Sequence, residues 1–175
     1  MTDRPSNPRA ARLNGLDVAE LQEYVASVEG DATQADRDPV VIGTWVGGTR
    51  SEITSPLGGP VVYMGGPDDP SAMGMLLRAL AACDIEVIAT RATLMGIEIK
   101  ELSVEARGHF NVGRYLGVDR GEGAGLQRVS YVVRLRTTAP LTAEQAATLE
   151  AAVAASPVGD TFGRQVALGF ELELA

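Results

Sequence analysis

A mostly apolar stretch at residues 69–95 constrains the fold of this chain more than any other part of the sequence. Pro70 and Ser71 are typical of a helix start, and Gly96 is typical of a helix end. Apolar residues cover most of the predicted circumference, which indicates a buried helix rather than one with a solvated face. One stripe at helical spacing includes the only cysteine of the chain. Its members are Leu76, Leu80, Cys83, Val87 and Leu94.

The Cys83 thiol on this stripe is predicted to point inward. A lone buried cysteine is, by default, a small hydrophobic side chain, so the helix alone leaves two interpretations open, filler and nucleophile. Asp84 follows the cysteine directly. An ionised carboxylate facing the thiol would raise the thiol pKa, although about 100° of helical rotation separates the two side chains.

The composition limits the class of protein. A chain of 175 residues is long enough for one domain with a core and short for two. Its net charge of −8 argues against binding to nucleic acid or to an anionic membrane. No apolar run reaches the length of a membrane span, and residues 1–15 show no apolar signal core. We therefore expect a soluble cytoplasmic protein.

The same composition argues against a cofactor or metal. One cysteine cannot form an intramolecular disulfide, and one cysteine with one histidine argues against a structural zinc site. The histidine, His109, ends a strand pattern and is interpreted as a surface or loop residue rather than a general base. No cofactor and no metal ligands are therefore predicted.

The first part of the chain is expected to lie outside the main domain. Residues 1–15 lack periodicity and are predicted to be a mobile lead-in. Asp17 can cap a helix over residues 18–28, and a polar linker follows. We therefore divide the chain into residues 1–37, lead-in plus N-terminal helix, and residues 38–175, a single domain.

Strand patterns gather in blocks on either side of the long helix. Three short strands are predicted before it, at residues 39–46, 49–55 and 61–64. Further elements follow it: strands at 97–110 and 126–138, a helix at 143–155 capped by Thr142, a break or restart at Pro157, and a last strand at 166–174. Because the strands do not alternate with helices, we expect an α+β fold with mainly antiparallel sheets.

Three segments match a known family pattern in order and in spacing. LLRALAAC at residues 76–83 is similar to a leucine- and alanine-rich central helix that ends in a peroxidatic cysteine. LGVD at 116–119 and LQRVSYVVRL at 126–135 resemble a segment from the second half of that family. SPVGDTF at 156–162 stands where many members carry a Cys-Pro-Val-type helix start. The chain thus resembles the OsmC/Ohr family of thiol-dependent hydroperoxide reductases over about residues 39–174.

The resemblance implies both a fold and a chemistry. The fold is an intertwined homodimer in which antiparallel sheets wrap around a pair of long, buried central helices, with active sites at the subunit interface. The chemistry is attack of a cysteine thiolate, here that of Cys83, on the O–O bond of a hydroperoxide. The resulting sulfenic acid is trapped by a second cysteine as a disulfide and then reduced by external thiols.

The family stabilises its thiolate with an arginine that follows a Gly-Gly turn, and GGTR places Arg50 close to that position with a one-residue offset. Such a charge lowers the pKa of a thiol. Arg50 is interpreted either as this partner or as an ordinary strand-edge charge, and Arg91 is a weaker candidate. A family glutamate that orients the arginine is replaced here by Met73. Asp68 or Asp69 would substitute for it only if the preceding loop folds back.

Ser156 occupies the position of the family's second, resolving cysteine. Serine cannot form the disulfide, so a Cys83 sulfenic acid would need an external thiol reductant, and the chain would be a one-cysteine variant. Ser156 is equally well interpreted as a helix cap before Pro157.

Two functions of different classes stay open. The first is a reductase of small organic or lipid hydroperoxides with Cys83 and Arg50 as catalytic residues, and the apolar neighbours of the thiol favour a hydrophobic substrate. The alternative is a catalytically inactive homodimer that binds a small apolar ligand at its interface, with Cys83 as filler. Neither function involves nucleic acid or a membrane as a partner.

Overall fold

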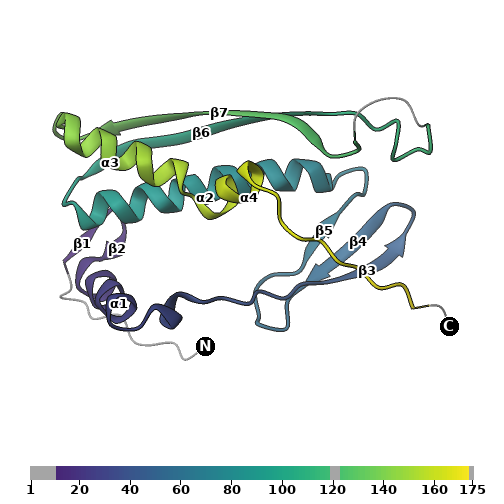
Figure 1. The fold of residues 1–175 in the computed structure, drawn as a ribbon, viewed down its shortest axis with the longest axis horizontal. Helices are drawn as coiled ribbons and strands as arrows, with labels where there is room; N and C mark the ends of the chain where they lie inside the picture. Colours follow the sequence, from purple (N-terminus) through teal and green to yellow (C-terminus); the bar gives the residue numbers. More distant parts are fainter. Residues whose placement is uncertain (1–10, 119–122, 174–175) are drawn as a thin grey trace.

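The computed structural model describes residues 11–118 and 123–173. Its elements in chain order are β1 (Arg12–Leu13), β2 (Leu16–Asp17), α1 (Val18–Gly30), η1 (Ala32–Ala35), β3 (Ile42–Gly47), β4 (Arg50–Thr54), β5 (Val62–Met64), α2 (Ala72–Leu94), β6 (Ile99–Phe110), β7 (Leu126–Thr137), α3 (Ala143–Ala154) and α4 (Pro157–Gly163). Every strand pair is antiparallel. Figure 1 shows α2 between the β6–β7 hairpin on one side and the N-terminal elements on the other. The predicted mixture of helices and antiparallel sheets is confirmed.

Helix α2 begins and ends close to the predicted positions. The Ser71 side chain caps its first turn by accepting a hydrogen bond from the Gly74 N–H at 3.1 Å. At the other end Gly96 has a φ of +70°, a left-handed conformation that glycine adopts at little cost. Among the described helices, α2 included, none is long and apolar enough to cross a membrane.

The buried face of α2 differs from the predicted one. Of the predicted stripe, Leu80 is buried, but Leu76 is 44% exposed and Cys83 is only half-buried. In one chain the helix is not buried around most of its circumference, because β6, α3 and α4 cover mainly one side of it. The stripe that is buried has four-residue spacing. Its members are Leu80, Asp84, Ile88 and Ala92.

The main core lies where α2 meets the β6–β7 hairpin and α3. Its buried cluster consists of Ile88, Ala92, Ile97 and Leu149. The two strands of the hairpin pair along their length, with Val104 opposite Val133. Helix α3 closes the core and starts with a capping box between Thr142 and Gln145, as predicted.

Residues 12–17, which we expected largely within an irregular lead-in, form the β1–β2 hairpin against the end of α2. Asn14 occupies its turn with a φ of +54°. The Asn14 amide group donates to Thr93 Oγ1 at 3.0 Å and to the Ile97 carbonyl at 2.9 Å, and its oxygen accepts from the Ile99 N–H at 2.8 Å. One side chain thus joins the hairpin to the corner between α2 and β6. Residues 1–10 of the predicted lead-in lie outside the described residues.

The three predicted strands before α2 are present as the sheet β3-β4-β5. Gly47 ends β3 and pairs with Arg50, so that Gly48 and Thr49 form the turn between the first two strands; the two glycines have φ values of +122° and +58°. This turn brings Arg50 to the first position of β4.

The predicted last strand is absent from the described part of the chain. Residues 165–173 run as extended chain without a strand partner, and the alternating apolar side chains of this segment are exposed, with Leu168 at 95% and Phe170 at 93%. The alternation is that of a strand, but a strand also needs a neighbouring sheet edge. Within one chain no described strand pairs with this segment.

Candidate functional site

Arg50 forms an ion pair with Asp69, in the loop just before the start of α2. Its Nε donates to Asp69 Oδ2 at 2.7 Å, and its guanidinium carbon lies 4.2 Å from the centre of the Tyr63 ring. The hydrogen bond to Asp69 raises the pKa of Arg50 above its ordinary value. The group is therefore a permanent cation whose orientation is fixed from two sides.

The loop before α2 does fold back, which is what the pairing of Asp69 with Arg50 requires. Gly65 has a φ of +79°, its N–H donates to the Pro70 carbonyl at 3.0 Å, and its carbonyl accepts from the Thr49 hydroxyl at 2.6 Å. A side chain at Gly65 would collide with the Thr49 carbonyl. This close backbone contact holds the loop against the start of β4. An acid therefore pairs with the arginine, although Met73 stands where the resemblance implies an orienting glutamate.

Cys83 lies in the middle of α2 as a free, half-buried thiol. Within the described residues of one chain, neither Arg50 nor Arg91 donates a hydrogen bond to its sulfur, and the guanidinium of Arg50 is engaged by Asp69. The structure thus brings Arg50 and Asp69 together, as required if Asp69 is to substitute for the orienting glutamate. It does not bring Arg50 into hydrogen-bonding contact with Cys83 inside a single chain.

Ser156 is fully buried at the junction of α3 and α4. Its hydroxyl oxygen accepts the N–H of Gly159 at 3.2 Å, which makes it the N-cap of α4, and Pro157 follows at the first helical position. The capping interpretation of Ser156 is confirmed.

Asp84 is a feature whose position the sequence did not predict. Although it directly follows Cys83, it points into the core and is 0% exposed, and within the described residues neither of its oxygens accepts a hydrogen bond. Burial, and then the negative charge of Asp84, raise the pKa of Tyr131 on β7 above its ordinary value. The four-residue spacing of Asp84 from Leu80 and Ile88 could have shown that it shares their face.

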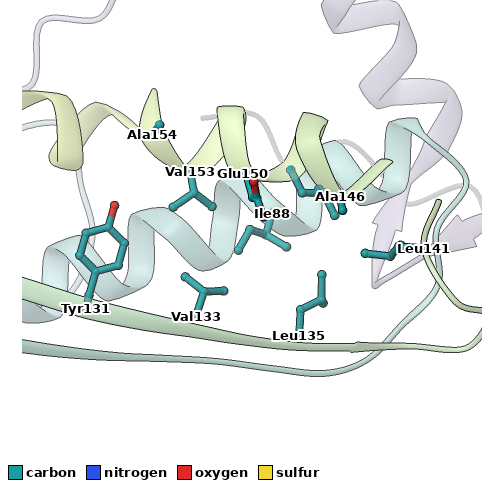
Figure 2. A pocket seen from close by; sticks show the side chains of 10 residues that line it. Ile88, Tyr131, Val133, Leu135, Leu141, Ala146, Glu150, Val153 and Ala154 are labelled. Atoms are coloured by element: carbon teal, nitrogen blue, oxygen red, sulfur yellow. The ribbon is translucent and has the colours of Figure 1, made fainter. Parts of the chain in front are cut away.

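An open groove of about 460 Å³ lies between α2, α3 and β7 (Figure 2). Its walls are mostly apolar, with Tyr131 at one end and Glu150 on α3. The lining residues are Ile88, Tyr131, Val133, Leu135, Leu141, Ala146, Leu149, Glu150, Val153 and Ala154. Cys83 does not line it. His109 lies elsewhere, exposed near the end of β6 opposite Arg128, as the surface interpretation predicts.

Within the described ranges, no three or more histidine, cysteine, aspartate or glutamate side chains lie together so that they could hold a metal ion. The candidate site contains the Cys83 thiol and the arginine that Asp69 orients, and a buried carboxylate, Asp84, lies next to Cys83 in the sequence.

Comparison with known proteins gives one family match and several structural matches. The family model described as OsmC-like protein matches residues 65–171. An OsmC-like protein from Mycoplasma pneumoniae superposes with a TM-score of 0.59 at 15% identity, covering 73% of this chain and 89% of that one. A Psychrobacter arcticus protein assigned to the osmotic stress and detoxification response gives 0.57 at 14%, covering 72% and 89%. The organic hydroperoxide resistance protein OhrB of Bacillus subtilis gives 0.45 at 18%, covering 71% and 89%. None of the curated proteins matches the sequence.

Proposed function

Since the chain belongs to the OsmC-like protein family, we propose that it is a thiol-dependent reductase of organic hydroperoxides with Cys83 as the nucleophile. The observation that carries this proposal is the Arg50–Asp69 ion pair. The acid is supplied by a different position from the family glutamate, and yet an arginine oriented by a carboxylate is retained. An arginine held in one direction by a carboxylate suits the stabilisation of a thiolate and of a departing oxygen.

The reaction begins with attack of the Cys83 thiolate on the terminal oxygen of the hydroperoxide. An S–O bond forms, the O–O bond breaks, and the departing alkoxide takes a proton and leaves as an alcohol. Cys83 becomes a sulfenic acid. Arg50 stabilises the negative charge of the attacking thiolate and of the departing oxygen.

Reduction of this sulfenic acid requires an external thiol, because Ser156 cannot supply a sulfur. The first reductant thiol forms a disulfide with Cys83 and releases water. A second thiol attacks this mixed disulfide and restores the Cys83 thiol. No cofactor beyond this reductant enters the cycle, and the reducing cytoplasm is where such thiols are abundant.

The active site is completed in a homodimer. Among the described residues of one chain Arg50 donates to Asp69 and not to Cys83. In the proposed dimer, Arg50 of one subunit faces Cys83 of the other. The exposed apolar residues support such an assembly: Leu76 and Ile85 on α2, and Leu168 and Phe170 near the C-terminus. A second copy covers these surfaces and gives the extended C-terminal segment a strand partner.

A second candidate function is binding of an apolar ligand without catalysis. The apolar groove favours it, because an apolar ligand could occupy the groove without any reaction at Cys83. The capping role of Ser156 also favours it, because this serine then has a structural purpose that is unrelated to a disulfide.

Intact-mass analysis separates the two functions. The reduced protein is mixed briefly with cumene hydroperoxide in the presence of dimedone, which traps sulfenic acids. The reductase predicts rapid addition of one dimedone per chain at neutral pH, and none in Cys83→Ser. A wild-type thiol that reacts no faster than free cysteine would refute the reductase and leave the binding protein.

A further inference from the structure

Residues 111–118, here called the tip turn, begin the connection between β6 and β7 and present apolar side chains to water. Tyr115 is 72% exposed and Leu116 is 66% exposed, and Val112 and Val118 on either side of them are about half exposed. Figure 1 shows the connection beyond the N-terminal end of α2, where the hairpin projects past the helix that it covers. Turns in water are usually built from Gly, Pro, Asn, Asp and Ser. A contiguous set of exposed apolar side chains at this place indicates a contact surface.

The tip turn is ordered by its own hydrogen bonds rather than by packing on the core. No residue of the turn is buried. The Asn111 side chain accepts the Gly113 N–H at 2.7 Å. The Gly113 carbonyl in turn accepts the N–H groups of Leu116 at 3.1 Å and of Val118 at 2.8 Å. The turn is therefore a closed loop of defined shape, and it holds Tyr115 and Leu116 in solvent.

Positive side chains lie directly behind the tip turn. His109 on β6 is opposite Arg128 on β7, and Arg107 is opposite Ser130. Alternate residues of a strand share a face, and so do paired residues of neighbouring strands, so these four side chains project from one face of the hairpin. With three neighbours they line an open hollow of about 680 Å³. Arg107 is paired with Glu105, and Arg128 forms no ion pair with another described residue.

The charge of the chain is distributed unevenly around this hairpin end. Residues 107–128 contain four arginines and two acidic residues, although the whole chain has 15 basic and 23 acidic residues. One of the arginines, Arg114, precedes Tyr115 in the tip turn itself. The net charge of −8 argues against an anionic partner only for a surface on which the charge is even. The end of the hairpin is basic on an otherwise acidic protein, and charge of this kind attracts anions locally.

We propose that the end of the β6–β7 hairpin docks on the surface of an anionic lipid membrane. Tyr115 and Leu116 enter the interfacial region, where tyrosine is favourable, and Arg114 lies at the level of the lipid phosphates. His109 and Arg128 are about 7 Å behind the start of the tip turn, at about 3.3 Å per strand residue. This distance is about the thickness of one headgroup layer. Docking does not involve Cys83 and does not depend on peroxide chemistry.

A membrane is favoured because it satisfies both parts of this surface. A dissolved anion would make no use of the apolar tip turn, and an uncharged apolar surface would make no use of the arginines. An anionic membrane buries apolar side chains and attracts cations at the same depth.

Sedimentation with lipid vesicles tests the proposal on the unmodified protein. Vesicles of phosphatidylglycerol and phosphatidylcholine in equal amounts are compared with vesicles of phosphatidylcholine alone. The protein is expected to sediment with the anionic vesicles at about 0.15 M salt and to be largely released at about 1 M, where the screening length falls from about 8 Å to about 3 Å. No binding to the anionic vesicles, or equal binding to both kinds of vesicle, would overturn the proposal.

Two variants with matched controls locate the contact. Leu116→Ser is expected to weaken binding to the anionic vesicles about tenfold. Leu57→Ser removes a side chain of nearly equal exposure between β4 and β5 and should leave binding unchanged. Arg128→Gln is expected to weaken binding about fivefold. Arg136→Gln makes the same change of charge at the other end of β7 and should have less effect. Undiminished binding by both Leu116→Ser and Arg128→Gln would refute docking through the hairpin end.

A second copy of the chain is the other surface that could cover the tip turn. In that case the wild-type protein would ignore the vesicles and Leu116→Ser would shift it toward monomer in sedimentation velocity, and these results together would overturn the membrane proposal. Cys83→Ser is expected to bind the anionic vesicles as the wild type does, which keeps this result separate from the proposed reductase.

Discussion

The Asp69 carboxylate accepts a hydrogen bond from Arg50 Nε at 2.7 Å, although 19 positions separate the two residues in the sequence. The contact depends on a loop that turns back at Gly65, so that Asp69, in the loop that leads into α2, meets Arg50, the first residue of β4. Asp69 has a side chain that is only 17% exposed, which shields the pair from water on one side. The arginine therefore has a defined direction before any substrate arrives.

Asp69→Asn is expected to slow oxidation of Cys83 by cumene hydroperoxide about tenfold, because Arg50 loses the charged partner that orients it. The rate of dimedone addition, followed by intact mass, measures this. Asp68→Asn is the control, since Asp68 is adjacent, exposed and equal in charge. If both variants react as fast as the wild type, the ion pair has no part in the reaction.

Asn14 is expected to contribute strongly to stability through its three hydrogen bonds at the corner between α2 and β6. Asn14→Gly keeps the left-handed backbone and loses these bonds, which should lower the free energy of unfolding by about 2–3 kcal/mol. Asn14→Ala should cost about 1 kcal/mol more, because alanine is strained at a φ of +54°. Urea denaturation measures both, and a glycine variant as stable as the wild type would show that the corner does not depend on Asn14.

Acid should weaken the β6–β7 hairpin through Glu105. Hydrogen bonds from Arg107 and Arg134 lower the pKa of Glu105 below its ordinary value of 4.5. A carboxyl group whose pKa is lower in the folded state stabilises the protein above its unfolded pKa, and this contribution is lost as the pH falls through the folded value. The drop in melting temperature between about pH 6 and about pH 3 should therefore be smaller in Glu105→Gln than in the wild type. An equally large drop in both proteins would contradict it, and Glu23→Gln on α1 serves as control.

Local signals in the sequence predicted most of the elements correctly. Ser71, Gly96 and Thr142 mark helix ends through hydrogen bonds to their immediate neighbours, and such contacts are visible in a short window. The sequence singles out both Arg50 and Asp69, but their meeting depends on the path of a whole loop. No spacing rule describes that path.

The orientation of α2 was predicted less well, for a physical reason. The helical periodicity of the apolar residues predicts that Cys83 lies on the buried stripe, because most of its neighbours on the helix are apolar. A carboxylate was not expected to share a buried face, yet Asp84 does so and Leu76 does not. The alternation at residues 166–172 predicts a strand, but the described residues form none there. No described strand of the same chain pairs with this segment, and a strand needs such a neighbour in addition to its alternating pattern.

The C-terminal segment should therefore control dimer formation. Replacing Leu168 and Phe170 by serine is expected to shift the protein toward monomer in sedimentation velocity, since these two side chains are almost fully exposed in one chain and need a partner to be covered. Serine at Glu171 and Glu173, on the alternate positions, should leave the dimer intact. A wild-type protein that sediments as a monomer at about 100 µM, far above the Kd of a nanomolar interface, would contradict the proposed assembly.

Asp84→Leu should make the ligand-free protein more stable. Leucine reproduces the branched shape of aspartate and removes two buried oxygens that have no donor in the described residues. Removing an unsatisfied buried polar group should raise the free energy of unfolding by about 1–3 kcal/mol, which urea denaturation resolves. Glu86→Leu makes the same change of charge on the exposed side of α2 and should have little effect. If Asp84→Leu is instead destabilised, the carboxylate has a donor in the folded protein, and the most economical donor is a second copy of the chain.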